Sequence, residues 1–154
     1  MAGARTDIRI EIDDADVRAM LREALARVEN LRPAMREIGE VLLSSTKDRF
    51  ADTTGPDGQR WAENRATTLA RKSGTRPLTD SGILGGTIAY QLDPSGNAVS
   101  IGTNRIYGAM QQFGGTRQMW PHLWGDIPPR PFLGISTDDR DQILTILRDH
   151  LTRP

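Results

Sequence analysis

The chain has 154 residues, which suits a single domain over 1–154 with enough chain for a real hydrophobic core. Its twenty basic and twenty acidic residues cancel, which predicts a soluble protein and argues against a general polyanion binder, because nucleic-acid modules usually show a basic excess. The absence of cysteine excludes disulfides, thiolate nucleophiles and thiolate zinc sites. With no long apolar run and no signal-like start, we expect neither membrane spanning nor export by a standard signal.

The first fifty residues predict a strand followed by helices. Residues 6–12 alternate between isoleucine and charged side chains, which is typical of a half-buried strand, here at a sheet edge. Asp13 and Asp14 are suited to cap a following helix. Apolar residues recur at helical spacing from Val17 towards residue 50. Because Pro33 ends, kinks or opens a helix, residues 14–50 predict one long bent helix or a helix pair.

The middle of the chain predicts a loop and two short helical pieces. Residues 51–62 form the loop, in which the Pro56-Asp57-Gly58 sequence is a turn and Trp61 pins the loop to the body. A short helix is expected near 63–72, and residues 73–77 end it. Thr79 or Asp80 is expected to cap a helical turn at 81–84, which Gly85-Gly86 then ends.

A hairpin is the clearest supersecondary feature. Residues 87–92 and 98–102 alternate as strands, and the sequence from Asp93 to Asn97 between them is rich in turn residues. Residues 105–113 then predict a short helix in which Tyr107 and Phe113 are apolar anchors.

Residues 127–134 predict an extended connector. Three prolines in four residues exclude a helix and a central strand, because proline has no N–H to donate. We expect Phe132 and Leu133 to dock this connector on the body. The last helix begins at Ser136, with Asp139 completing a capping box. Its expected apolar stripe is Ile143, Leu144, Leu147 and Leu151.

Together these elements predict an α+β fold, in which a small and mainly antiparallel sheet is packed by long N-terminal helices and a C-terminal helix. The expected core includes Leu21, Leu25, Ile38, Leu42, Val99, Ile101, Phe132 and Leu147.

The sequence shows no constellation for catalysis, for a metal or for a cofactor. His122 and His150 are far apart, and the acidic clusters at 13–16 and 138–141 lie at helix starts, where carboxylates offset the helix dipole. No Gly-x-Ser-x-Gly motif is present, and Gly82, Gly85 and Gly86 lack the spacing of a phosphate-binding loop. We therefore expect a protein that is not an enzyme and uses no cofactor.

Two surface features are candidates for function. The segment 59–76 carries a basic excess, which is either a solvated face, a rim that meets a neighbouring copy, or a surface near DNA. Its basic residues are Arg60, Arg65, Arg71, Lys72 and Arg76. Trp120 and Trp124 lie in a loop, where they either form a small satellite core or anchor a protein contact. Arg130, held extended between prolines, could reach a carboxylate or carbonyl on a partner.

The segment from 105 to 136, with YG..QQFGG followed by IPPRPFLGIS, resembles the virion morphogenesis, or tail-completion, proteins of long-tailed phages of the Mu-like and P2-like group. Three further blocks agree in order: PDGQRW at 56–61, LTDSGIL at 78–84 and VSIGTN at 99–104. The loop with Trp120 and Trp124 departs from the group by its richness in tryptophan.

The resemblance implies a non-enzymatic assembly protein at the head-proximal end of the tail, which finishes the tail tube and prepares it to join the head. It implies a ring, with six copies to match the symmetry of the tail, assembled in the host cytoplasm and located in the virion. The implied partners are other copies, the tail tube or tail terminator, and head-neck proteins, with DNA only passing through the lumen and no membrane.

A closed ring requires head-to-tail contacts between two different patches on each subunit. The connector and tryptophan loop, with Trp120, Trp124, Arg130 and Phe132, are the candidate for one patch. The basic segment 59–76 is the candidate for the other patch or for the lumen. Two alternatives stay open: a small DNA-binding module that uses residues 59–76, and an enzyme such as a metal nuclease or peptidase.

Overall fold

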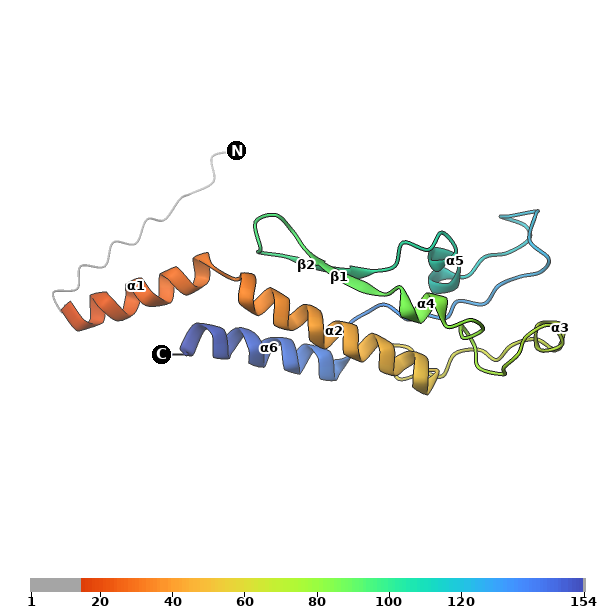
Figure 1. The fold of residues 1–154 in the computed structure, drawn as a ribbon, viewed down its shortest axis with the longest axis horizontal. Helices are drawn as coiled ribbons and strands as arrows, with labels where there is room; N and C mark the ends of the chain where they lie inside the picture. The colour runs from red at the N-terminus through yellow and green to blue at the C-terminus, as the bar shows by residue number, and fades with distance from the viewer. Residues whose placement is uncertain (1–14, 154) are drawn as a thin grey trace, which may run out of the picture.

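The computed structural model describes residues 15–153 (Figure 1). This range contains six helices and one two-stranded antiparallel sheet, so the α+β prediction is confirmed. The helices are α1 (Ala15–Glu29), α2 (Arg32–Asp52), α3 (Ala66–Leu69), α4 (Ile83–Gly86), α5 (Gly108–Phe113) and α6 (Thr137–Thr152). The strands are β1 (Ala89–Leu92) and β2 (Val99–Gly102). No helix among the described residues is long and apolar enough to cross a membrane.

The N-terminal region forms a helix pair. Helix α1 ends at Glu29, and α2 begins two residues after Asn30 with Pro33 in its first turn, where proline lacks only an N–H that has no intrahelical partner. Helix α2 ends where Thr53 adopts a left-handed conformation with φ 56°. The predicted strand at 6–12 and the predicted caps Asp13 and Asp14 lie outside the described residues.

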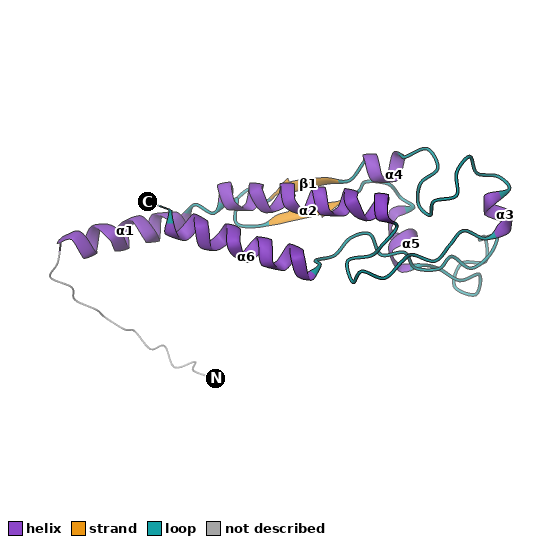
Figure 2. Cartoon of the chain, turned by 90° about the horizontal axis from the view of Figure 1, so that it is seen from below, coloured by secondary structure: helices purple, strands orange, loops and turns teal. Residues whose placement is uncertain are grey.

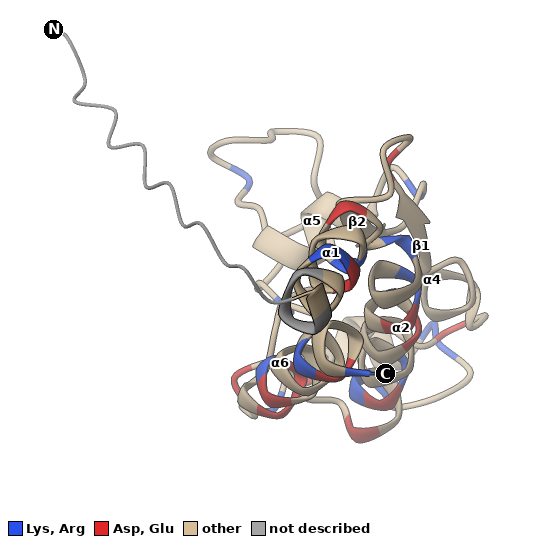
Figure 3. Cartoon of the chain, turned by 90° about the vertical axis from the view of Figure 1, so that its left-hand side faces the viewer, with Lys and Arg blue, Asp and Glu red and all other residues tan. Residues whose placement is uncertain are grey.

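Helix α2 is the centre of the molecule. It packs against α6 on one side and against the β1–β2 hairpin on another, as the view along the long axis shows (Figure 3). Its buried residues Ala34, Ile38 and Leu42 meet Ile146 of α6. Val99 and Ile101 of the hairpin and Leu147 of α6 pack against the same cluster but are only half-buried, so their predicted place in the core is confirmed in part.

The hairpin approaches α2 closely at one glycine. A Cβ atom built on Gly39 would lie only 2.4 Å from Cδ2 of Tyr90, so the helix has no room for a side chain there. The Tyr90 hydroxyl reaches across α2 and donates a hydrogen bond to Oε1 of Glu40 at 2.7 Å. The hairpin pairs Ala89 with Gly102 and Leu92 with Val99. The predicted hairpin is therefore present, with strands slightly shorter than the predicted 87–92 and 98–102.

A second core lies at the C-terminal end of α2. The Phe50 ring is 5.4 Å from the Trp61 ring and 5.5 Å from the Phe132 ring, measured between centroids. Leu84 and Ile88 complete this buried cluster. Trp61 therefore pins the loop after α2, and Phe132 docks the connector, as the sequence predicted.

The short helices differ from their predictions. Helix α3 covers four residues where ten were expected. Helix α4 begins after Gly82, which has φ 74° and makes no side-chain capping hydrogen bond. The prediction that Thr79 or Asp80 caps this turn is wrong, because the chain reverses through a left-handed Leu78 and places the helix start later. Gly85 and Gly86 lie inside the helical turn instead of following it.

The apolar stripe of α1 is exposed. Leu21 is 48% and Leu25 58% exposed, so their predicted place in the core is wrong. The periodicity is that of an amphipathic helix, but α1 extends past the layers of α2 and the hairpin, and its main contact is with the end of α6 (Figure 2). No other described element covers its apolar face.

Two further apolar predictions fail for related reasons. Phe113 is 77% exposed and Tyr107 is also exposed, so α5 is anchored by Gly108, which is buried against Thr103, and not by its aromatic residues. On α6 the most buried apolar residue is Ile146, whereas Leu144 and Leu151, two members of the predicted stripe, are exposed.

Candidate assembly surface

The connector at 127–134 is held by its own arginine. Arg130 is buried, its Nε donates to the carbonyl of Ala62 at 2.7 Å and its Nη2 to the carbonyl of Glu63 at 3.0 Å. Burial lowers the pKa of the Arg130 guanidinium, and the carbonyl oxygens offset part of its lost hydration. Arg130 therefore bonds within its own chain, and it does not extend towards a partner as predicted.

Side chains also make hydrogen bonds to the backbone N–H and carbonyl groups of residues 131–133, because the prolines prevent this segment from pairing in a β-sheet. Trp61 Nε1 donates to the Pro131 carbonyl at 2.7 Å. Gln112 accepts at Oε1 from the backbone N–H groups of Phe132 and Leu133, and donates to the Leu133 carbonyl, all at 3.0 Å. Phe132 is almost fully buried, so it too belongs to the core and not to the contact surface.

A buried ion pair joins this connector to both long helices. Arg49 on α2 donates through Nη1 to the carbonyls of Phe132 and Gly134, both at 3.0 Å. Its Nη2 meets Ser45 and the carboxylate of Asp139 at the start of α6. Arg49 is 5% exposed and Asp139 1%. One guanidinium therefore fixes the connector against the two helices that flank it.

The sequence alone predicts Asp139 only as a helix cap. The capping box exists, since Asp139 N–H bonds Ser136 Oγ at 3.0 Å and Ser136 N–H bonds the Asp139 carboxylate at 2.9 Å. The missed partner was Arg49, which follows the buried Leu42 by seven residues and therefore shares its helix face. A charged residue on the apolar face of a helix was the available signal.

The pKa of Asp139 lies below its ordinary value. Burial acts to raise it, but hydrogen bonds from Ser45 and Ser136 and the charge of Arg49 together outweigh that effect. The carboxylate is therefore ionised at neutral pH, and the ion pair is intact there.

The loop with the tryptophans is closed at its base. Gly115 and Ile127 exchange two backbone hydrogen bonds of 2.9 and 2.7 Å. Gly114, with φ 72°, allows the two segments to approach each other closely, since a Cβ atom on this residue would lie 2.7 Å from the Ile127 carbonyl oxygen. Asp126 accepts from the Arg117 N–H at 2.8 Å inside the loop. Residues 116–126 thus form a compact loop on a clamped base.

The two tryptophans differ in their surroundings. Trp120 lies against Gly115, and its ring centroid is 6.2 Å from that of His122, so it partly fits the satellite-core interpretation. Trp124 is 92% exposed, with the Arg71 guanidinium carbon 5.4 Å from its ring centroid. The structure therefore brings the tryptophan loop beside the basic segment and presents one indole to solvent.

The basic segment does not form one helix face. Arg60, Arg65, Arg71 and Arg76 are exposed, and only α3 interrupts the loops that carry them. Lys72 is half-buried, and that burial lowers its pKa, while nearby Asp80 acts in the opposite direction. The segment lines more than one surface pocket, so its charged side chains are distributed around this end of the molecule.

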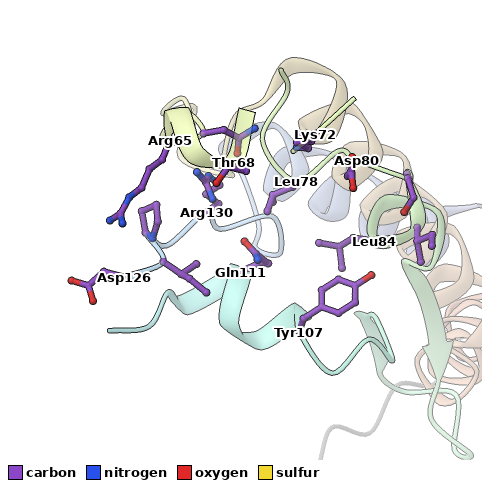
Figure 4. Close-up of a pocket in the computed structure, with 16 residues that line it drawn as sticks. Arg65, Thr68, Lys72, Leu78, Asp80, Leu84, Tyr107, Gln111, Asp126 and Arg130 are labelled. Atoms are coloured by element: carbon purple, nitrogen blue, oxygen red, sulfur yellow. The ribbon is translucent and has the colours of Figure 1, made fainter. Parts of the chain in front are cut away.

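A pocket of about 430 Å³ separates the basic segment from α5 (Figure 4). Lys72, Asp80 and Asp126 contribute charges of both signs to its lining, and Tyr107 lies along α5. Gln111 lines the pocket, and its Oε1 is buried without a hydrogen-bond partner among the described residues. The described part of the chain has no group of three or more His, Asp or Glu residues that could hold a metal ion.

Comparison with known proteins identifies the family of this chain. A model of the phage virion morphogenesis family matches residues 12–152. The chain belongs to this family. The resemblance seen in the sequence blocks is confirmed, and the match spans both long helices, the hairpin and the connector.

Two relatives cover nearly the whole chain of this phage virion morphogenesis protein. The "Putative capsid assembly protein G" of Escherichia phage Mu is 28% identical over 156 aligned positions, covering 95% of each protein. The "Mu-like prophage FluMu G protein 2" of Haemophilus influenzae is 31% identical over 144 positions, covering 93% of this chain and 95% of that protein. No solved structure matches the chain. The family is one of virion assembly, and the DNA-binding alternative gains no support from these comparisons.

Proposed function

We propose that this protein completes the phage tail at its head-proximal end and prepares it to join the head, acting without catalysis as a closed ring of six copies. Membership of the virion morphogenesis family supports an assembly role, and the resemblance to tail-completion proteins supports the place in the tail. The observation that carries the proposal is the exposed tryptophan loop on its clamped base.

Physical reasoning favours a contact role for this loop. A large indole left in water gains nothing for the folded monomer, whereas tryptophan is among the strongest residues at protein interfaces. The backbone pair at Gly115 and Ile127 and the prolines after it limit the conformations of the free loop. Docking a restrained loop loses less conformational entropy than docking a flexible one. Trp120 and Trp124 are therefore our candidates for contact with another copy or with the tail.

The exposed basic residues Arg60, Arg65, Arg71 and Arg76 suit a rim of the ring. They would meet acidic residues of a neighbouring copy, or face DNA that passes through the lumen. The proposed further partners are the tail tube or tail terminator and head-neck proteins, in a particle assembled in the bacterial cytoplasm.

The test is complementation of a phage that lacks this gene. We expect Trp120→Ala with Trp124→Ala to give a folded protein, by circular dichroism and thermal melting, that leaves separate heads and tails in electron micrographs. Ile135→Ala is the matched control, because Ile135 is also an exposed apolar residue but lies outside the loop, and it should give joined, infectious particles.

Three results would count against parts of the proposal. Joined particles at normal titre from the double variant would remove the loop from the contact. Failure of the double variant to fold would make the tryptophans core residues. A gene deletion that yields no filled or empty heads would point to capsid assembly, as in the name of the Mu relative, and not to tail completion.

A further inference from the structure

The two-stranded sheet leaves the outer edge of each strand unpaired. Asp93 N–H donates to the Ala98 carbonyl at 3.0 Å, so the next facing pair, Leu92 and Val99, is a non-hydrogen-bonded pair of the antiparallel ladder. By the same alternation, Val99 and Ile101 direct their backbone N–H and carbonyl groups away from β1. No hydrogen bond between described residues reaches these groups. The outer edge of β2 is therefore open to a further strand.

Strand β2 also lacks the features that keep an exposed sheet edge from pairing. Natural sheets protect such edges with charged side chains, proline or a β-bulge. The sequence of β2 is Val-Ser-Ile-Gly, which has no charge and no proline, and its four residues pair with β1 without a bulge. An edge of this composition is typical of a strand that another segment covers.

The surroundings favour the edge of β2 over that of β1. Beside β1, the Tyr90 hydroxyl donates to the exposed side chain of Glu40, so that flank of α2 is polar. Beside β2, Val99 and Ile101 pack on the cluster that contains Ile146 of α6 (Figure 3). A strand with one apolar face therefore fits beside β2. The further α6 residues that pack on this cluster and are only half-buried are Ile143 and Leu147.

The chain contains one further segment with the pattern of such a strand. In residues 6–12, isoleucine alternates with charged residues, which predicts one apolar and one charged face. These residues lie outside the described part of the chain, which begins at Ala15. The apolar face matches the apolar flank of β2, and the charged face would continue the exposed outer face of the hairpin, where Ser100 lies. The apolar face is Ile8, Ile10 and Ile12, and the charged face is Asp7, Arg9 and Glu11.

Helix α1 keeps this segment away from the hairpin of its own copy. The hairpin turn lies at the start of α2, where Arg32 Nη2 donates to the Pro94 carbonyl at 2.8 Å. From there α1 extends away from the strands, and its 15 residues span about 22 Å (Figure 1). Residue 12 lies within about 11 Å of Ala15, and a strand over 6–12 is about 20 Å long. Folded straight back, its first residues would reach only the turn, so full pairing with β2 needs another copy.

We propose that residues 6–12 of one copy add a third strand to the outer edge of β2 in the next copy. The added strand supplies main-chain hydrogen bonds to the open edge, and its alternate side chains pack on the apolar flank. The donated strand and the receiving edge are different surfaces of the same chain. Each copy therefore gives one strand and accepts one, which is the head-to-tail contact of a closed ring. This inference rests on the proposed ring and names one of its contacts.

Disulfide cross-linking tests the pairing, since the chain has no cysteine. Asp7→Cys, Arg9→Cys and Glu11→Cys are each combined with Ser100→Cys in the full chain. Facing residues on one side of a sheet come close enough for a disulfide, so at least one combination should give a ladder of cross-linked copies on a denaturing gel. Ile10→Cys with Ser100→Cys is the matched control and should stay monomeric, because these two side chains would lie on opposite faces of the sheet.

A second control separates the two edges of the sheet. Gln91 lies on the same exposed face as Ser100 but on β1. It would be about 10 Å from a strand added beside β2, which is beyond the reach of a disulfide. Gln91→Cys in place of Ser100→Cys should therefore give no ladder.

Assembly in solution provides a second measurement. The triple variant Ile8→Ser, Ile10→Ser, Ile12→Ser removes the apolar face, and analytical ultracentrifugation should show at least tenfold weaker association than for the wild type. The matched control changes the three charged residues of the same segment to serine, keeps the apolar face and should assemble as the wild type does. Both variants should keep the wild-type melting temperature at concentrations where the protein is monomeric, because neither changes a described residue.

Several outcomes would overturn the strand exchange. They are a wild-type protein that stays monomeric at all accessible concentrations, cross-links that do not follow the alternation of faces, a ladder with Gln91→Cys but not with Ser100→Cys, and disulfides that form only within one chain. Unchanged assembly of the isoleucine variant would overturn it as well. If particles still depend on this gene for joining in any of these cases, the strand exchange is wrong while the proposed place in the tail stands.

Other outcomes would keep the exchange and contradict the proposed function. Face-specific cross-links that stop at dimers would support the strand pairing but not a ring. Normal joining of particles without this gene would contradict the proposed place in the tail, whatever the cross-links show.

Discussion

Removal of the Asp139 carboxylate should destabilise the protein far more than the loss of a helix cap. In Asp139→Ala the Arg49 guanidinium keeps its bonds to the carbonyls of Phe132 and Gly134, but its charge is left buried without a counter-charge. Breaking one partner of such a pair costs about 3–5 kcal/mol. A lost cap alone costs about 0.5–2 kcal/mol. The expected loss for Asp139→Ala is therefore the larger of these two.

The matched control is the neighbouring residue. Asp138 lies in the same first turn of α6 but is exposed, so Asp138→Ala should cost only the dipole interaction, about 0.3–1 kcal/mol. Urea unfolding followed by circular dichroism, at concentrations where the protein is monomeric, gives both free energies. For a chain of this size each kcal/mol lowers the melting temperature by roughly 2–4 °C.

A double replacement separates charge from packing. Arg49→Met with Asp139→Leu removes both charges together, and we expect it to be markedly more stable than Asp139→Ala, because apolar replacement of a whole buried pair is often nearly neutral. A loss below about 2 kcal/mol in Asp139→Ala, equal to that of a cap, would refute the reasoning that the pair is buried and mutually dependent.

The remaining predictions concern pH, close packing and the second core. Because the folded pKa of Asp139 is depressed, the stability that its ionised carboxylate contributes is present above about pH 4 and is lost as the pH falls through the folded pKa. Asp139→Asn should therefore reduce the loss of unfolding free energy at acid pH in unfolding titrations. An unchanged loss at acid pH would contradict the assignment. Gly39→Ala should lower the free energy of unfolding by about 1–3 kcal/mol because its Cβ would collide with the Tyr90 ring. Gly86→Ala, the control, has open space and should stay within about 0.5 kcal/mol of the wild type. Equal melting temperatures of the two variants would refute the close approach at Gly39. Phe132→Ala should cost about 3–5 kcal/mol in urea unfolding, since Phe132 is the most buried aromatic residue, and a loss near zero would show that the connector is not docked.

The sequence determined the features that depend on local chemistry. Pro33 predicted a kink or a new helix near residue 33, because proline disrupts a helix interior but is accepted in a first helical turn. Turn residues from Asp93 to Asn97 and the alternation on either side of them predicted the hairpin, whose register the structure then showed. The capping box at Ser136 was readable because both partners lie within four residues. The sequence blocks also identified the family, which no single element would have done.

Only the tertiary structure decided which apolar faces are covered. The stripes of α1 and α2 have the same helical period, yet α2 packs on both α6 and the hairpin while α1 extends beyond them. Arg130 and Phe132 were expected on a contact surface. In the structure Arg130 points inward to the carbonyls of Ala62 and Glu63, and Phe132 packs on the ring of Phe50. Arg49 and Asp139 are ninety residues apart. Periodicity reports that a helix has an apolar face, but what lies opposite that face depends on contacts between distant segments, which no local pattern contains.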